Sequence, residues 1–242
     1  MGDIAANWQR IQAAIEAATR RVGRSPTDVR VIAASKTKSP EVIREAIAAG
    51  LRDFGENYVQ EAEEKIRELH RDDVRWHMIG HLQRNKAARA VELFDTIQSL
   101  DSVALGRALA QQAAARQHPV RVFLEVNVGG EASKNGVSPA AAGRLMESLA
   151  DAEWMSIDGL MTVPPPAPLE VARRFFRELR CLRDTLRERQ QRNAPLRELS
   201  MGMTDDFVVA VEEGATIVRI GRALLGARPA KVAPVERARE ER

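Results

Sequence analysis

The sequence predicts one (β/α)8 barrel of the TIM-barrel class, preceded by an extra helix at the N-terminus. Eight apolar, β-branched segments alternate with helical ones, which indicates a parallel sheet, and eight such units close into a barrel. The chain has 242 residues, a length at which α/β barrels form a single domain. With 44% hydrophobic and 29% charged residues, the composition excludes a largely disordered chain.

The first elements illustrate the pattern. An amphipathic helix is predicted near the N-terminus because five apolar residues recur at spacings of three, four and seven: Ile4, Trp8, Ile11, Ile15 and Val22. The β-branched segment 29–35, VRVIAAS, then predicts a buried strand. Ser39 and Pro40 begin the next helix, with proline at its first position, and Gly50 ends it.

The same alternation continues along the rest of the chain. Further strands are expected at residues 52–55, 75–79, 95–99, 120–128, 155–161, 197–200 and 216–220. Helices are expected at 57–69, 84–93, 102–117, from Ser138-Pro139 onward, 168–190 and 204–213. The segments EVIREAIAAGLRDFGE and DFVVAVEEGATIVRIG share a helix–glycine–strand pattern, as a repeated unit would. We expect the barrel to span residues 1–228 and residues 229–242 to form a charged tail.

Charge gives little support for a nucleic-acid partner. Lys and Arg total 37 against 34 Asp and Glu, which leaves a formal charge of only +3. The segment Arg173–Arg192 carries eight arginines, but it also contains acidic residues, and mixed charge is typical of a solvated helix face. Aromatic residues make up only 4% of the chain and do not interleave with these arginines as stacking platforms would. We therefore expect no nucleic-acid partner.

Several other classes of protein and site are also disfavoured. No apolar run approaches the roughly 18 residues that a membrane helix needs. The N-terminal segment lacks the basic cap and unbroken apolar stretch of a signal peptide, so we expect a cytoplasmic protein. The single cysteine, Cys181, excludes an intramolecular disulfide and a multi-cysteine metal site. We expect no bound metal and no membrane contact.

In a barrel of this kind, functional side chains lie at the C-terminal ends of the strands. Lys36 ends an apolar strand and shares a strand face with Ile32 and Ala34, since alternate residues point the same way. A lysine in this place either forms a salt bridge or acts as an amine nucleophile. Lys38 and Arg219, if they lie nearby, would lower its pKa by like-charge repulsion and so favour the nucleophilic amine.

The segments that follow the last two strands predict a phosphate site. LSMGMTDD and RIGRALLG each place a glycine between a short strand and a helix. We expect Thr204 to cap the first of these helices and Gly221 to precede the second. Helix N-termini that follow strands seven and eight of a barrel commonly bind phosphate.

Two pairs of polar residues allow more than one interpretation. His77 and His81 lie in WHMIGHLQRNK, where the strand prediction places them at different heights, so hydrogen-bonding roles are favoured over zinc binding. Glu125 and Asn127 share a face of the fifth strand. They either line the mouth of the barrel or satisfy each other inside it, and the sequence does not decide between these alternatives.

Six motifs in order carry a specific resemblance: VIAASKTKSPEVIREAIAAGLRDFGENYVQE, WHMIGHLQRNK, VNVGGEASKNGV, GLMTVPP, LSMGMTDDF and EEGATIVRIG. Together they resemble the pyridoxal phosphate (PLP) homeostasis protein family. Members of that family are single-domain proteins similar to the barrel domain of bacterial alanine racemase. The resemblance covers the chain from about Ile4 to Arg228.

The resemblance implies a cofactor, pyridoxal 5'-phosphate, and a site for it. It implies that Lys36 holds PLP as a Schiff base and that Asn57 lies beside the cofactor. It further implies that Ser200 and Gly221 help to hold the phosphate, and that Arg219 faces the pyridine nitrogen. No residue is implied to be catalytic in its own right.

The chain departs from the family pattern at one site position. The family usually has a hydroxyl residue after the glycine of its RIG motif, and this chain has Arg222 there. Arg222 either replaces the lost hydroxyl contact with a charge-assisted one, or points away and leaves backbone N–H groups to hold the phosphate.

Two classes of function compete on this basis. The first is a PLP carrier or buffer in intracellular PLP homeostasis, and the alternative is a PLP-dependent amino-acid racemase. A cation beside the pyridine nitrogen disfavours protonation of that nitrogen, which makes PLP a poor electron sink. Racemisation also needs a second base, which alanine racemases supply as a tyrosine from an additional domain, whereas the one tyrosine here is Tyr58.

We therefore expect a carrier or buffer without robust catalytic activity. A third interpretation, a Schiff-base aldolase acting on phosphosugars, shares the lysine and the phosphate site but does not explain the six motifs. We expect the protein to be a monomer, and the recipients of its cofactor to be PLP-dependent apoenzymes.

Overall fold

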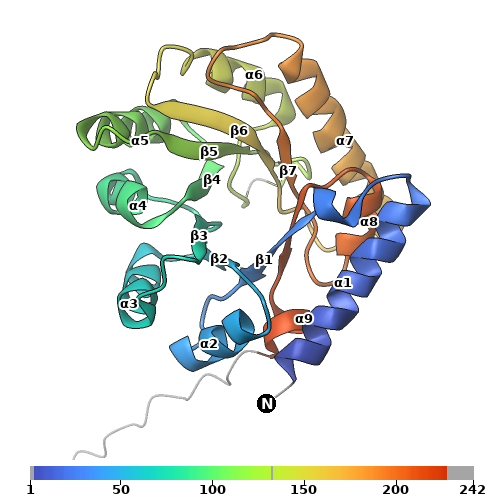
Figure 1. Cartoon of the computed structure of the whole chain (residues 1–242). Helices are drawn as coiled ribbons and strands as arrows, with labels where there is room; N and C mark the ends of the chain where they lie inside the picture. Colours follow the sequence, from blue (N-terminus) through green and yellow to red (C-terminus); the bar gives the residue numbers. More distant parts are fainter. Residues whose placement is uncertain (1–2, 132, 228–242) are drawn as a thin grey trace, which may run out of the picture.

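The computed structural model describes residues 3–131 and 133–227, and within them the predicted barrel is confirmed (Figure 1). Eight parallel strands pair in chain order, and the last strand pairs with the first to close the sheet. The strands are β1 (Arg30–Ala34), β2 (Asp53–Glu56), β3 (Arg75–Met78), β4 (Thr96–Leu100), β5 (Val120–Glu125), β6 (Met155–Met161), β7 (Glu198–Ser200) and β8 (Ile217–Ile220). The predicted charged tail, residues 229–242, lies outside the described residues.

Helices surround the barrel on its outside (Figure 1). They are α1 (Ile4–Arg21), α2 (Pro40–Ala48), α3 (Val59–Leu69), α4 (Ala87–Leu93), α5 (Val103–Ala115), α6 (Pro139–Glu147), α7 (Leu169–Arg187), α8 (Phe207–Glu212) and α9 (Arg222–Leu225). Short 3₁₀ turns, η1 (Pro26–Asp28) and η2 (Arg84–Lys86), precede β1 and α4. None of the helices in the described part of the chain is both long and apolar enough to cross a membrane.

The extra N-terminal helix, α1, packs against α8 and α9 (Figure 1). Asp3 caps it by accepting a hydrogen bond from the backbone N–H of Ala6 at 3.0 Å. The Asn7 side chain donates to the carbonyl of Leu224 in α9 at 3.1 Å. The N-terminal helix is therefore attached to the last helices of the barrel.

Apolar side chains form two layers. The larger layer lies between the strands and the helices and includes Val218 and Ile220. A smaller cluster fills the inside of the barrel and consists of Ile32, Phe123, Met161 and Ile217. In β8, Ile217 thus points inward while Val218 and Ile220 pack outward, as alternate residues of a strand do. Because the inner apolar layer is thin, polar side chains fill the barrel above and below it.

Several predicted boundaries differ from the structure by one to three residues. The helix expected at 84–93 begins with the 3₁₀ turn η2, and the strand expected at 120–128 ends at Glu125. After Glu125 the chain forms a loop that brings Val137 beside Val126. The backbone N–H of Val137 donates to the Glu125 carbonyl at 2.9 Å, and the Val137 carbonyl accepts from the Asn127 N–H at 2.8 Å. The helix expected from Thr204 begins only at Phe207, with Asp206 at its N-cap position, so the prediction that Thr204 caps it is wrong.

Several arginines of helix α7 form ion pairs with glutamates at the end of α8. Arg173 and Arg177 lie 2.7 Å and 3.0 Å from the carboxylates of Glu212 and Glu213, and Arg180 lies 3.3 Å from Glu213. These ion pairs are partly exposed, so each contributes little to stability, but together they fix the two helices relative to each other. The mixed-charge helix face predicted from the sequence therefore joins two neighbouring elements.

Candidate functional site

The predicted site residues gather at one end of the barrel. Lys36 lies in the loop after β1, Asn57 follows β2, and Ser200 is the last residue of β7. Arg219 lies in β8, and Gly221 and Arg222 begin α9. Because all eight strands are parallel, these positions share the C-terminal mouth of the barrel, the end at which barrels of this class bind ligands.

The loop that carries Lys36 is fixed on both sides of that residue. The carbonyl of Ser35 accepts a hydrogen bond from Nζ of Lys65 at 2.8 Å. The backbone N–H of Thr37, in a left-handed conformation with φ 64°, donates to Oε1 of Glu61 at 2.5 Å. Lys36 is half-buried between these two anchors. The backbone around the candidate nucleophile is therefore held by side chains of α3.

The anchors belong to a buried ionic cluster that the sequence reasoning missed. Nζ of Lys65 lies 2.7 Å from Glu56 and 2.6 Å from Glu61, and the Ser35 hydroxyl donates to Glu56 at 2.6 Å. Burial raises the pKa of Glu56, while Lys65 and the Ser35 hydroxyl act in the opposite direction. The spacing of Glu61 and Lys65, four residues apart on one helix, was the available signal, but it is also typical of an exposed pair.

Asn57 is positioned by the loop after β3. A Cβ atom at Gly80 would lie 2.6 Å from the Asn57 carbonyl oxygen, so only glycine permits this close approach. Asn57 lines a cleft of about 480 Å³ at the mouth, together with Tyr58, His81, Lys86 and other residues. Tyr58 is the N-cap residue of α3, and its side chain is largely exposed.

Arg219 is buried at the base of the mouth, in a chain of hydrogen bonds that crosses the barrel. Its Nη1 donates to the Ser200 hydroxyl at 2.6 Å, and its Nη2 donates to the carbonyl of Thr162 at 2.7 Å. The Ser200 hydroxyl in turn donates to Oε1 of Gln98 in β4 at 2.6 Å. Ser200 is fully buried, and its hydroxyl is used both as an acceptor and as a donor within the barrel.

Two nearby carboxyl groups, those of Glu125 and Asp206, influence the pKa of Arg219. Burial lowers the pKa of Arg219 to about 10, while Glu125 and Asp206 partly oppose this effect. The guanidinium therefore stays charged at neutral pH. Burial also raises the pKa of Glu125 to about 7, assisted by Asp101 and opposed by Arg219. The base of the mouth thus contains a fixed cation beside a carboxyl group that titrates near neutrality.

Glu125 and Asn127, which the sequence left undecided, do not satisfy each other. Asn127 shapes its own loop, because its amide donates to the Glu131 carbonyl at 2.8 Å and accepts from the Gly130 N–H at 3.0 Å. Glu125 is buried near Arg219, and within the described chain its Oε2 atom has no hydrogen-bond partner. The structure therefore excludes the alternative in which these two residues satisfy each other.

The residues expected to form a phosphate site lie in the loops after β7 and β8. Gly221 is the N-cap residue of α9, and the N–H of Ala223 approaches the Thr204 hydroxyl at 3.5 Å. Arg222 reaches across to the other loop, where its Nη2 lies 2.7 Å from Asp205, with both side chains exposed. Thr204 therefore contributes to this corner through α9, although it does not cap α8.

The other lysine of the KTK segment has a defined position. Nζ of Lys38 donates to the carbonyls of Gly226 and Ala227, at 2.9 Å and 2.6 Å. Burial lowers the pKa of Lys38. This contact fixes the end of α9 to the loop that carries Lys36, so the two sides of the mouth are linked.

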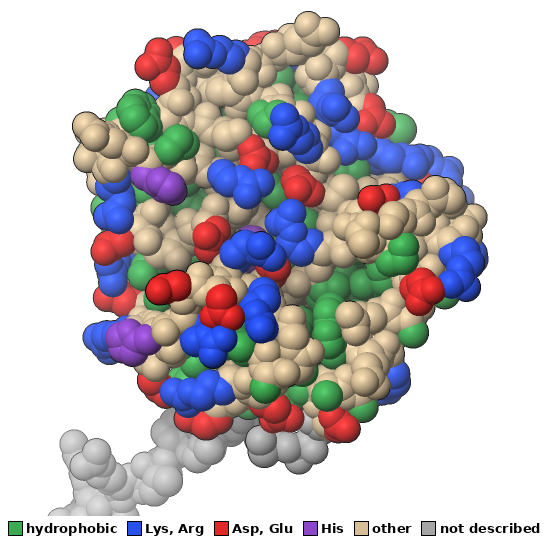
Figure 2. Space-filling view, viewed as in Figure 1, with side chains coloured by type: hydrophobic (Ala, Val, Ile, Leu, Met, Phe, Trp, Pro, Cys, Tyr) green, Lys and Arg blue, Asp and Glu red, His purple; other side chains and the backbone are tan. Residues whose placement is uncertain are grey.

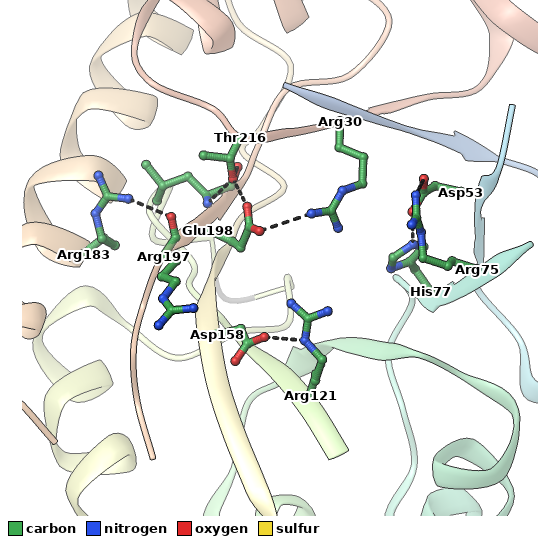
Figure 3. A network of polar contacts seen from close by, with 11 residues as sticks. Arg30, Asp53, Arg75, His77, Arg121, Asp158, Arg183, Arg197, Glu198 and Thr216 are labelled. Atoms are coloured by element: carbon green, nitrogen blue, oxygen red, sulfur yellow. Dashed lines mark hydrogen bonds and ion pairs between the residues drawn. The ribbon is translucent and has the colours of Figure 1, made fainter. Parts of the chain in front are cut away.

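His77 does not lie at this mouth, although it belongs to the third strand of the same barrel. Its Nε2 lies 2.9 Å from Oδ1 of Asp53, at the end where the strands begin (Figure 3). His81 lies 3.5 Å from Asp101. The two histidines thus lie beside different carboxylates, and His77 forms a hydrogen bond of the kind that the preferred interpretation expects. In residues 3–131 and 133–227, no three His, Cys, Asp or Glu side chains are grouped as a metal site would need.

The chain is similar to known proteins along almost its whole length. Residues 2–229 match the family model described as the N-terminal domain of alanine racemase. The chain is 43% identical over 229 residues to the pyridoxal phosphate homeostasis protein of Pseudomonas aeruginosa, which covers 94% of this chain and 97% of that protein. It is 43% identical over 221 residues to the protein of the same name from Aquifex aeolicus, covering 90% and 96%.

Solved structures agree with this match. PipY of Synechococcus elongatus with PLP bound superposes with a TM-score of 0.81 at 36% identity, covering 92% of this chain and all of that one. An alanine racemase from Clostridium difficile superposes with a TM-score of 0.72 at 14% identity over 58% of its length, which shows a shared fold alone. Both the sequence and the barrel therefore lead to one assignment: the chain belongs to the pyridoxal phosphate homeostasis protein family.

Proposed function

We propose that this protein binds pyridoxal 5'-phosphate at the C-terminal mouth of its barrel and acts as a carrier or buffer in PLP homeostasis. The observation that carries the proposal is the placement of Lys36, buried Arg219 and the Gly221 turn around one barrel mouth. The names of the relatives, and a PipY structure that contains PLP, support the same function.

The residues at the mouth fit the chemistry of PLP. The amine of Lys36 can react with the aldehyde of PLP, and the guanidinium of Arg219 can donate a hydrogen bond to its unprotonated ring nitrogen. Backbone N–H groups at the start of a helix can bind its phosphate. Gly221 adds a further indication. A Cβ atom there would meet its nearest neighbour, the Ala34 carbonyl, at an ordinary 3.5 Å, so packing within the protein does not require glycine. A ligand that approaches the backbone at Gly221 would require glycine there, because a side chain would block its approach.

Each residue has a distinct role in this proposal. When bound, PLP supplies an electrophilic aldehyde, and the ε-amine of Lys36 is its covalent attachment point. Asn57 flanks the cofactor. Gly221 offers its backbone to the phosphate, and Arg222 lies at the rim of the same corner, where it is paired with Asp205. Ser200 acts by holding Arg219, because its hydroxyl already accepts from that side chain.

Arg219 also supports a carrier over an enzyme. It is held by two hydrogen bonds and stays charged at neutral pH, since its pKa of about 10 is well above 7. We infer that it faces the ring nitrogen, where a fixed cation disfavours protonation. Without that proton the ring withdraws electrons weakly and stabilises carbanions poorly. We further propose that the protein is a monomer and that PLP-dependent apoenzymes receive its cofactor.

Borohydride trapping tests the attachment point. Reduction of the PLP-loaded protein, followed by peptide mapping, should place a stable pyridoxyl group on Lys36. Lys36→Ala should abolish the trapped adduct while the fold persists, because the residue lies in a loop at the mouth. Lys38→Ala and Lys134→Ala serve as controls that should retain it. An adduct that maps to Lys38 or Lys134 in the unaltered protein would show that the assignment is wrong.

A further inference from the structure

A second cleft opens at the opposite end of the barrel, where the strands begin. It has a volume of about 750 Å³ and is lined by the starts of β1, β3, β4 and β5 and by the end of α4. Basic and acidic side chains gather over the centre of this face of the molecule (Figure 2). Four arginines line the cleft, Arg30, Arg75, Arg116 and Arg121, against two acidic residues, Glu92 and Asp95.

Three of the arginines are held in place by carboxylates that do not line the cleft. Arg75 forms two hydrogen bonds with Asp53, at 2.8 Å and 2.6 Å. Arg30 donates to Glu198 at 3.2 Å, and Arg121 donates to Asp158. Figure 3 shows the side chains of Arg30 and Arg121 extending toward each other across the opening.

The guanidinium groups keep donors for a ligand. A guanidinium has five N–H donors, and each of these arginines uses only one or two of them on its carboxylate. The side chains of Arg75 and Arg121 are 55% and 48% exposed, so their remaining donors are accessible. The carboxylates therefore pre-orient the donors, which lowers the entropy cost of binding an anion.

His77 gives an independent sign of a ligand. It lines the cleft and is 1% exposed, and its Nε2 is paired with Asp53. Its second ring nitrogen, Nδ1, is buried and has no hydrogen-bond partner in residues 3–131 and 133–227. Buried polar atoms are nearly always satisfied, so an unsatisfied one at the wall of a cleft indicates a missing partner.

We propose that this cleft is a second binding site, for the phosphate groups of a small phosphorylated molecule. Oriented guanidinium groups match phosphate oxygens in geometry and charge. The site also has an apolar wall, formed by Val91, Leu93, Phe94 and Pro119, against which the remainder of such a molecule packs. It lies at the end of the barrel away from Lys36 and does not depend on how PLP is held.

Calorimetric titration of the PLP-saturated protein with sodium pyrophosphate, at constant ionic strength, tests this site. Saturating PLP keeps the mouth filled, so the expected result is saturable binding with no change in the absorption spectrum of the bound PLP. Displacement of PLP, or the absence of saturable heat, would overturn the proposal, because the anion would then bind at the mouth or nowhere.

Variants locate the binding. Arg121→Gln should weaken pyrophosphate binding by about tenfold or more, as expected for the loss of a charged hydrogen bond. Arg116→Gln provides a second variant that leaves the three carboxylate pairs intact, and it should weaken binding severalfold. Arg144→Gln, which changes an exposed arginine on α6, is the matched control and should bind as the unaltered protein does. If all three variants bound pyrophosphate as tightly as the unaltered protein does, the arginines of the cleft would have only a structural role at the base of the barrel.

Discussion

Nζ of Lys65 lies 2.7 Å from Oε1 of Glu56, and both side chains are almost completely buried. The same ammonium group holds the carbonyl of Ser35 at 2.8 Å, immediately before Lys36. Because β2 supplies Glu56 and α3 supplies Lys65, this ion pair connects the barrel wall to the loop that carries the candidate nucleophile. The position of Lys36 therefore depends on a charge pair beneath it.

Lys65→Met should destabilise the protein by about 3–5 kcal/mol, because it leaves the carboxylate of Glu56 buried without its partner. The double variant Lys65→Met/Glu56→Gln removes both charges and should recover part of that loss. Urea unfolding measures the free energies of unfolding. The rate at which the borohydride-trapped adduct forms shows whether the loop still holds Lys36 in position. Arg89→Met, which breaks partly exposed pairs with Glu63 and Glu92, is the control and should cost no more than about 1 kcal/mol. Equal losses in Lys65→Met and Arg89→Met would contradict the role assigned to the buried pair.

This cluster also shows what the sequence pattern could not predict. Periodicity identifies each strand and helix because it depends on neighbours within a few residues. It placed Lys36 at a strand end for the same reason. Whether Lys65 is exposed or buried depends instead on the packing of α3 against β1 and β2, which no local pattern encodes. A helix that carries Glu61 and Lys65 at a spacing of four is indistinguishable from a solvated one by sequence alone.

The hydroxyl groups after β7 give a second example. The sequence shows Ser200 at a strand end, where a hydroxyl faces either a ligand or the barrel interior. The choice depends on Gln98 and Arg219, which come from β4 and β8 and meet Ser200 only in the closed barrel. At Thr204 the local signal was misleading, because the turn stabilised by Asp206, which accepts from the Met203 N–H at 2.6 Å, delays the start of α8.

Glu125 should make stability depend on pH between about 4.5 and 7. Its pKa in the folded protein, about 7, is raised above the ordinary value of 4.5, so the fold binds a proton that the unfolded chain has released. This contribution is fully present below pH 4.5 and is lost as pH rises to 7. Relative to Glu125→Gln, the unaltered protein should therefore lose about 3 kcal/mol over that interval.

Chemical denaturation of both proteins at pH 5 and pH 8 measures this difference. Glu125→Gln should show the smaller loss of stability between the two pH values. Glu153→Gln provides a matched control, because it removes a carboxyl group that is exposed. Parallel pH profiles for the unaltered protein and Glu125→Gln would mean that this carboxyl titrates outside the interval.

The PLP-loaded protein should not racemise alanine or another common amino acid faster than free PLP does. Racemisation needs a base on each face of the substrate, and Tyr58, the one tyrosine in the sequence, is 62% exposed rather than packed into the mouth. Exchange of the substrate α-proton in deuterated water, followed by NMR, measures this. Tyr58→Phe should leave both the slow exchange and the Lys36 adduct unchanged. Rapid, stereochemically clean exchange that Tyr58→Phe abolishes would establish the racemase alternative.

Arg219 and Arg222 should have separable effects on the bound cofactor. Arg219 is buried and held by Ser200 and Thr162, whereas Arg222 is exposed at the rim and paired with Asp205. Arg219→Glu would replace the cation beside the ring nitrogen with a carboxyl and favour protonation of that nitrogen, so the absorption spectrum of bound PLP should shift. Because that substitution also places an acid near Glu125, Arg219→Gln and Arg219→Lys are needed beside it. We expect Arg219→Gln to shift the spectrum partly and Arg219→Lys to preserve it.

Arg222→Ala should leave that spectrum unchanged and should weaken PLP binding if its guanidinium gives up Asp205 for the phosphate. The expected loss of PLP-binding free energy is about 1.5–3 kcal/mol, the range for a charged hydrogen bond. Asp205→Ala separates the two roles of Arg222, because it releases the guanidinium and should leave affinity unchanged or tighten it. Unchanged affinity in Arg222→Ala would show that backbone N–H groups at Gly221 hold the phosphate without this side chain. A spectrum that does not respond to Arg219→Glu would remove the main chemical reason for assigning a carrier, since no cation at the ring nitrogen would then be limiting the reactivity of PLP.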